Sequence, residues 1–143
     1  MDLEKIFNQQ IANLSVLYFK LHHFHWFVQG KEFYIYHELY ENLYQETTAL
    51  IDQFAERLLA IKGTPVSTLK DFLALSSIQE GVSATCPVEI SKILIADYSI
   101  IIDKLREGIK AAEDIGDLSS ADMFIGIITD LEKHIWMFNQ VIK

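Results

Sequence analysis

Residues 31–61, KEFYIYHELYENLYQETTALIDQFAERLLAI, form the stretch that decides the fold. Apolar side chains recur three or four positions apart along it, and neither glycine nor proline interrupts it. This spacing predicts one amphipathic helix that ends where Gly63-Thr64-Pro65 breaks the pattern. At 1.5 Å per residue such a helix is about 45 Å long. Helices of similar length are needed to cover its apolar face.

The rest of the chain supplies these partner helices. Helical spacing predicts a first helix up to about Val28, ended by Gln29-Gly30, because glycine suits the residue after a helix end. Further helices are predicted from Pro87 to about Ile115, and from cap candidates in Ser119-Ser120-Ala121-Asp122 almost to Lys143. Thr68-Leu69-Lys70-Asp71 is typical of a capping box and predicts a short helix over residues 69–75. Residues 1–143 are therefore predicted to form a single all-α domain. Its fold is a ferritin-like four-helix bundle with a short extra helix in the long crossover between helices 2 and 3.

Composition narrows the class of protein. Half of the 143 residues are hydrophobic, which excludes a disordered chain, while charged or polar residues interrupt every apolar run too early for a membrane span. Twenty acidic and twelve basic residues give a formal net charge of −8, which disfavours a polyanion-binding surface. The apolar content is high for a small monomer, so we expect surfaces that contact other subunits.

Two features bear on where the protein works. The single cysteine, Cys86, cannot form an internal disulfide, and we interpret it as a bystander thiol in a reducing compartment. The start, Met1-Asp2-Leu3-Glu4-Lys5, lacks the basic and apolar regions of a secretory signal. We therefore expect a cytoplasmic protein.

The helix of residues 31–61 carries two pairs of candidate metal ligands. His37 and Glu41 are four residues apart, as are Asp52 and Glu56, so each pair lies on one face of the helix. His25 precedes the Gln29-Gly30 turn, where an antiparallel helix can bring it beside His37. Imidazole nitrogen together with carboxylate oxygen suits Fe, Mn or Zn. The spacing therefore predicts a carboxylate–imidazole metal site.

Helix geometry limits how the two pairs can cooperate. Glu41 and Asp52 are eleven residues apart, which corresponds to about 16 Å along the helix axis. Metal–ligand bonds are about 2 Å long, so one chain cannot close both pairs on a single ion. Two copies of the helix, packed antiparallel about a two-fold axis, would set the first pair of one chain against the second pair of the other. No Glu-x-x-His motif occurs, so we do not expect the usual di-iron site inside the bundle.

Several segments together are similar to a known family. They are Lys20-Leu21-His22-His23-Phe24-His25-Trp26-Phe27-Val28-Gln29-Gly30, Ala55-Glu56-Arg57-Leu58, Gly63-Thr64-Pro65 and Lys133-His134-Ile135-Trp136-Met137. The chain resembles Dps proteins, the mini-ferritins named as DNA-binding proteins from starved cells. The resemblance implies a hollow dodecamer that oxidises Fe(II) to Fe(III), preferably with hydrogen peroxide. It also implies that the shell stores the ferric mineral and limits oxidative damage.

The resemblance also implies roles for individual residues. It assigns His25, His37 and Glu41 to one subunit's half of a ferroxidase site, and Asp52 and Glu56 to the half from its mate. Many members have aspartate where this chain has Glu41, which changes the expected coordination geometry but not the type of ligand. Trp26 would be the nearby aromatic that is oxidised in place of diffusible radicals, although packing explains it equally well. Three acids, Glu113, Asp117 and Asp122, would line a three-fold pore that admits iron.

Other interpretations remain open. One alternative is a structural or adhesive stress assembly with the same shell, which uses the site for Zn(II) or for no metal. A DNA-compacting protein is disfavoured, because no Lys/Arg-rich tail is visible and a dodecamer would carry about −96, twelve times −8. We interpret His22, His23 and His134 as structural histidines, and we expect Arg57 to form a salt bridge.

Overall fold

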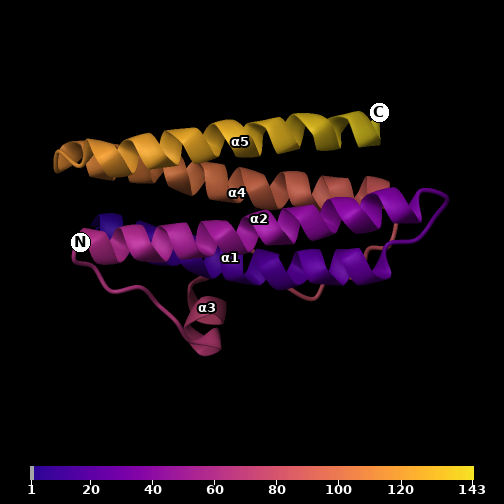
Figure 1. Cartoon of the computed structure of the whole chain (residues 1–143), viewed down its shortest axis with the longest axis horizontal. Coiled ribbons are helices and arrows are strands. Elements are labelled where there is room, and N and C mark those ends of the chain that lie inside the picture. Colours follow the sequence, from indigo (N-terminus) through magenta and orange to yellow (C-terminus); the bar gives the residue numbers. More distant parts are fainter. Residues whose placement is uncertain (1) are drawn as a thin grey trace.

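The computed structural model describes residues 2–143, which form five helices (Figure 1). They are α1 (Asp2–Phe27), α2 (Phe33–Ala60), α3 (Leu69–Leu75), α4 (Pro87–Asp114) and α5 (Leu118–Ile142). The four long helices lie side by side, and α3 stands outside them in the crossover from α2 to α4. The predicted all-α bundle, including its short extra helix, is confirmed. No helix within residues 2–143 combines the length and the apolar character needed to cross a membrane.

The long helices pack chiefly as two pairs. α1 packs against α2 and α4 packs against α5, while α1 also contacts α4 and α3. Three fully buried rings from three of these helices meet in the core: the Phe7 ring lies 5.8 Å from that of Phe54 and 5.0 Å from that of Phe124. Burying such rings is the main favourable contribution to folding, so this core holds the helices in register.

Local sequence signals explain most helix ends. α4 begins with Pro87 in its first turn, and the Thr68 hydroxyl accepts a hydrogen bond from the Asp71 N–H (3.1 Å) at the start of α3. The predicted cap of the last helix was wrong. Asp117, not a residue of 119–122, caps α5, and its carboxylate accepts a hydrogen bond from the Ser120 N–H (3.0 Å). The helix therefore begins earlier than the serines suggested.

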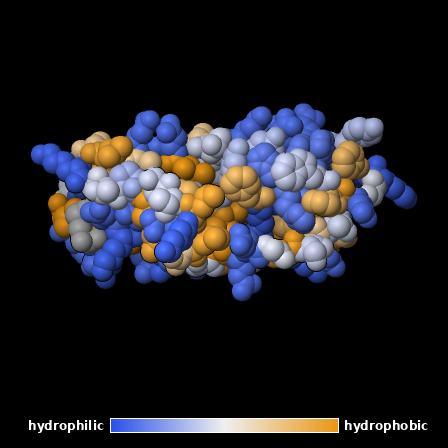
Figure 2. All heavy atoms as spheres, turned by 90° about the horizontal axis from the view of Figure 1, so that it is seen from below, coloured by the Kyte–Doolittle hydropathy of each residue, from blue (hydrophilic) through white to orange (hydrophobic). Residues whose placement is uncertain are grey.

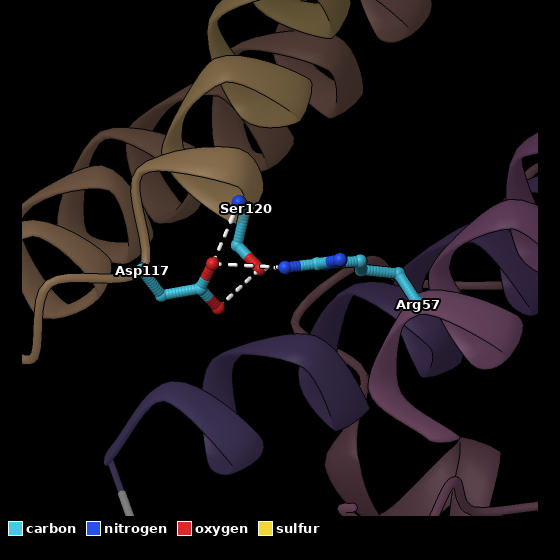
Figure 3. A network of polar contacts seen from close by, with 3 residues as sticks. All are labelled: Arg57, Asp117 and Ser120. Atoms are coloured by element: carbon cyan, nitrogen blue, oxygen red, sulfur yellow. Dashed lines mark hydrogen bonds and ion pairs between the residues drawn. The ribbon is translucent and has the colours of Figure 1, made fainter. Parts of the chain in front are cut away.

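Polar side chains link α2 to α5 along their length. Near the end of α2, the Arg57 guanidinium donates to the Asp117 carboxylate (2.9 Å) and to the Ser120 hydroxyl (3.0 Å), as Figure 3 shows. Farther along, His134 Nε2 lies 2.8 Å from a Glu46 carboxylate oxygen. The salt bridge expected for Arg57 is confirmed.

Apolar side chains gather near the middle of the face that carries α3 (Figure 2). A groove of about 600 Å³ lies there between α1, α2 and α3, and its apolar lining includes Phe19, Ile51, Leu69 and Phe72. Phe19 and Leu69 are among the most exposed large apolar residues of the described chain. Contiguous apolar surface of this kind is typical of a protein–protein contact.

Candidate metal centre

Two histidines form the structured part of the candidate site. His25 lies in the last turn of α1 and His37 in the first turns of α2, on either side of the turn that contains Gly30. Their rings stack in parallel, with centroids 3.7 Å apart and planes 13° apart. Each ring also contacts the backbone of the other residue: His25 Nδ1 lies 2.6 Å from the His37 carbonyl oxygen, and His37 Nδ1 lies 2.7 Å from that of His25.

This reciprocal pairing determines which nitrogen of each ring is free. A carbonyl oxygen can only accept a hydrogen bond, so both Nδ1 atoms must carry the proton. In the neutral ring the lone pair then lies on Nε2, which is the nitrogen left to bind a metal. The contacts therefore preset both imidazoles as Nε2 ligands and keep the two rings together without any metal.

Glu41 is the carboxylate nearest to this pair. It lies one turn farther along α2 than His37, and its Oε1 is 3.8 Å from His25 Nε2. This separation is too long for a hydrogen bond, but one ion at about 2 Å from each atom could bridge it. The Glu41 side chain is 41% exposed, so it can still turn towards a bound cation.

The other two predicted ligands lie elsewhere on the same helix. Asp52 and Glu56 are exposed, and neither forms a hydrogen bond or ion pair with another side chain of residues 2–143. α2 runs without interruption from Phe33 to Ala60, so about 16 Å of helix separates Asp52 from Glu41. Across residues 2–143, no three His, Cys, Asp or Glu side chains converge closely enough to hold a metal ion. The chain thus presents two separate groups of candidate ligands.

Comparison with known proteins identifies the family. The family model for the ferritin-like domain matches residues 4–143. DNA protection during starvation protein 2 of Bacillus anthracis is 42% identical over 133 residues, which cover 93% of this chain and 91% of that protein. The chain belongs to the Dps family.

Solved Dps structures show the same fold. Dps from Staphylococcus aureus superposes with a TM-score of 0.95 at 40% identity, and the match covers 99% of this chain and 95% of that one. Dps from Vibrio cholerae O1, described as a member of a broad superfamily of ferritin-like diiron-carboxylate proteins, superposes with a TM-score of 0.95 at 28% identity. That match covers 99% of this chain and 89% of the other. Both the predicted family and the predicted fold class are therefore confirmed.

Next to the histidine pair, this Dps chain has a cluster of rings that includes His22, Trp26 and Tyr44. The Tyr44 ring packs edge-on to His25, with centroids 5.4 Å apart, and the His22 ring stacks on Tyr44 at 3.7 Å. Burial, and then the neighbouring His25, lowers the pKa of His22. Trp26 is 62% exposed and its ring contacts His22 at 5.3 Å. Glu41 and Tyr44 are three residues apart, which places them on one face of α2. This spacing could have indicated from the sequence that Tyr44 lies beside the candidate ligands.

The three predicted pore acids lie near the turn between α4 and α5. Glu113 and Asp122 are exposed, whereas Asp117 caps α5 and is paired with Arg57 (Figure 3). Burial works to raise the pKa of Asp117, but the hydrogen bonds from Ser120 and the charge of Arg57 outweigh it and hold that pKa below its ordinary value. Asp117 therefore keeps its charge, although Arg57 already offsets much of the potential it projects. That these acids line a pore stays a prediction.

Proposed function

We propose that this Dps chain assembles with its own copies, as a dodecamer, and acts as a ferroxidase that oxidises Fe(II) preferentially with hydrogen peroxide. The ferric product is stored as a mineral inside the shell, which protects the cell from oxidative damage. The observation that carries the proposal is the incomplete ligand set: two preset imidazoles in one place, and two unpaired carboxylates about 16 Å away on the same helix.

A two-fold contact between α2 helices would complete the site. His25, His37 and Glu41 of one subunit would face Asp52 and Glu56 of its mate, and the symmetry would produce two identical sites per dimer. Nitrogen and carboxylate ligands suit both Fe(II) and Fe(III), and the three carboxylates favour the more highly charged ferric ion. Two Fe(II) ions give one electron each to peroxide, which takes up two protons and leaves as two water molecules.

The acidic character of the chain supports attraction and storage of iron. Its formal net charge of −8 favours cations over polyanions, and Glu113 and Asp122 present exposed carboxylates near the turn between α4 and α5. In this proposal, these two acids and Asp117 admit Fe(II) at a three-fold axis. Compaction of DNA is not part of the proposal, because this charge repels phosphate. We place the protein in the cytoplasm, where its single thiol stays reduced.

A second candidate is a structural stress assembly whose site holds Zn(II) or no metal. Zinc accepts the same imidazole and carboxylate ligands and has no redox chemistry. Dps from Listeria innocua, whose structure was determined after a zinc soak, superposes with a TM-score of 0.93 at 36% identity. The two candidates therefore differ in what the site does with Fe(II), not in the fold.

Anaerobic loading with Fe(II), followed by hydrogen peroxide, tests the proposal. The wild-type protein should form Fe(III) faster than buffer does, as measured by its ultraviolet absorbance, and the ferric product should stay with the particle in size-exclusion chromatography. The His25→Ala/His37→Ala variant should lose this acceleration. His23→Ala is the matched control, because His23 lies on the same helix and packs against Phe27 rather than His37. A wild-type rate equal to that of buffer would favour the structural assembly.

A further inference from the structure

Tyr44 lies where an electron can leave the protein for the candidate iron site. Within residues 2–143, the ring contacts of His25 and His37 are with each other, with Phe33 and with Tyr44. A phenol is far easier to oxidise than the benzene ring of Phe33. Within residues 2–143 of one chain, Tyr44 is therefore the oxidisable aromatic residue whose ring contacts a candidate histidine ligand.

Trp26, which the family resemblance suggested for this role, lies farther along the same set of rings. Its ring contacts His22 and has no ring contact with His25 or His37. Trp26 is 62% exposed, so much of its surface faces away from the rest of its own chain. Through ring contacts within one chain, Trp26 is connected to His25 only by way of His22 and Tyr44, among the residues that the structure describes.

The surroundings of Tyr44 hold its ring in place. His22 stacks on it with centroids 3.7 Å apart and planes 18° apart, and the Tyr18 ring meets both residues edge-on, 5.8 Å from Tyr44 and 4.7 Å from His22. His22 Nδ1 is buried and has no hydrogen-bond partner within the described chain. The phenol oxygen of Tyr44 carries a hydrogen, as tyrosine ordinarily does at neutral pH. The cluster thus presents a neutral, oriented phenol to His25.

We propose that Tyr44 donates the second electron when peroxide meets a site that holds a single Fe(II). This inference rests on the proposed ferroxidase function. Fe(II) gives one electron and becomes Fe(III). The Tyr44 phenol gives the other electron together with its proton and becomes a neutral tyrosyl radical. The O–O bond of peroxide breaks, and the products are one hydroxide and one water molecule, whose second hydrogen is the phenol hydrogen.

The radical is then available to a second Fe(II). That ion reduces the tyrosyl radical, a proton from solvent restores the phenol, and a second Fe(III) forms. The sum is two Fe(II) oxidised for one peroxide, the same as when two ions are present together. Tyr44 therefore lets a half-loaded site consume peroxide without releasing hydroxyl radical, and its contacts with His22 (stacked) and Tyr18 (edge-on) keep the radical within the protein.

Freeze-quench electron paramagnetic resonance of the assembled protein tests this role. Protein loaded anaerobically with one Fe(II) per site is mixed with one equivalent of hydrogen peroxide and frozen within milliseconds. The wild-type protein should show a tyrosyl signal that narrows when its tyrosines are ring-deuterated. Tyr44→Phe should lose the signal and release hydroxyl radical to a spin trap. Tyr34→Phe is the matched control and should keep the signal, because Tyr34 is 84% exposed and, within residues 2–143, its ring contacts only Phe33.

Three results would overturn the role of Tyr44. They are a Tyr44→Phe signal as large as that of the wild type, a wild-type signal that belongs to tryptophan, and wild-type iron oxidation without any protein radical. Spin-trap labelling and peptide mapping of the wild-type protein provide a second measurement that needs no variant, and the label should lie on Tyr44 or Tyr18. Failure of the proposed function is distinguishable, because the wild type would then oxidise iron no faster than buffer even with two Fe(II) per site.

Discussion

The proposed division of the candidate site between two subunits predicts that two inactive variants can restore each other. His37→Ala removes one of the paired imidazoles, and Asp52→Asn removes the charge of a carboxylate about 16 Å away on the same helix. Each variant alone lacks a ligand at every site. In a dimer with one chain of each kind, one site carries both substitutions and the other carries neither.

The size of the recovery follows from this symmetry. When the two chains mix randomly in equal amounts, half of the dimers are mixed and half of the sites in those dimers are intact, so about a quarter of all sites regain every ligand. A site within one chain would regain none. Because metal–ligand bonds are about 2 Å long, the described geometry leaves no route by which one chain could close the set.

Co-expression with two affinity tags and sequential purification yields the mixed particle. The measured quantity is the initial rate of Fe(III) formation after hydrogen peroxide is added to the loaded protein, relative to the wild type. The matched control mixes His37→Ala with His25→Ala, which damage the same half of the site and should therefore restore nothing. No recovery in the first mixture, or equal recovery in both, would show that the ligands are not shared as described.

Three further predictions concern stability and DNA. Lys20 and Asp97 form a buried ion pair (2.8 Å, side chains 4% and 7% exposed), so Lys20→Met should lower the free energy of unfolding in urea by about 3–5 kcal/mol. The double variant Lys20→Met/Asp97→Leu should recover most of that loss. A double variant whose loss of unfolding free energy equals the sum of the two single losses would contradict this account. Because Ser120 and Arg57 hold the pKa of Asp117 below its ordinary value, its carboxylate stabilises the fold above about pH 4, and this stability is lost as the pH falls through the lowered pKa. Asp117→Asn should therefore reduce the fall of the melting temperature between about pH 4 and lower pH, as measured in thermal melts. An unchanged pH dependence of the melting temperature would assign that loss of stability to other groups. With a net charge of −8, the protein should not retard linear DNA in a gel at about 150 mM salt and neutral pH, whereas a shifted band would show DNA contact.

Most of the fold could be predicted because its signals are local. The apolar period of α2, the glycine after α1 and the proline at the start of α4 each act within a few residues, so they locate helices without knowledge of the neighbours. The cap of α5 was mispredicted because the local sequence offers several residues that can cap a helix. Serine and aspartate both make good caps, and only the fold shows that Asp117 supplies the oxygen while Arg57 from α2 holds it in place.

The sequence was enough to propose candidate ligands but not to orient them. Spacing along α2 and the position of His25 before the turn singled out these residues, and their role as ligands stays a prediction. The hydrogen bonds from each imidazole to the other residue's carbonyl oxygen, which set the free nitrogen, depend on how α1 and α2 meet. Tyr44 had the helical spacing of an ordinary packed aromatic, so only its contact with His25 distinguishes it.

The motifs of the sequence indicated the Dps family. The sequence by itself also determined that this chain forms a helical bundle and that the His37/Glu41 and Asp52/Glu56 pairs cannot close on one ion within a chain. Both conclusions follow from the periodicity and the rise of a single helix, which need no tertiary contact. The tertiary structure alone decided the orientation of His25 and His37, the ring cluster around Tyr44 and the pairing of Asp117 with Arg57. These features join residues from different helices, and the contacts between helices arise only when the bundle packs.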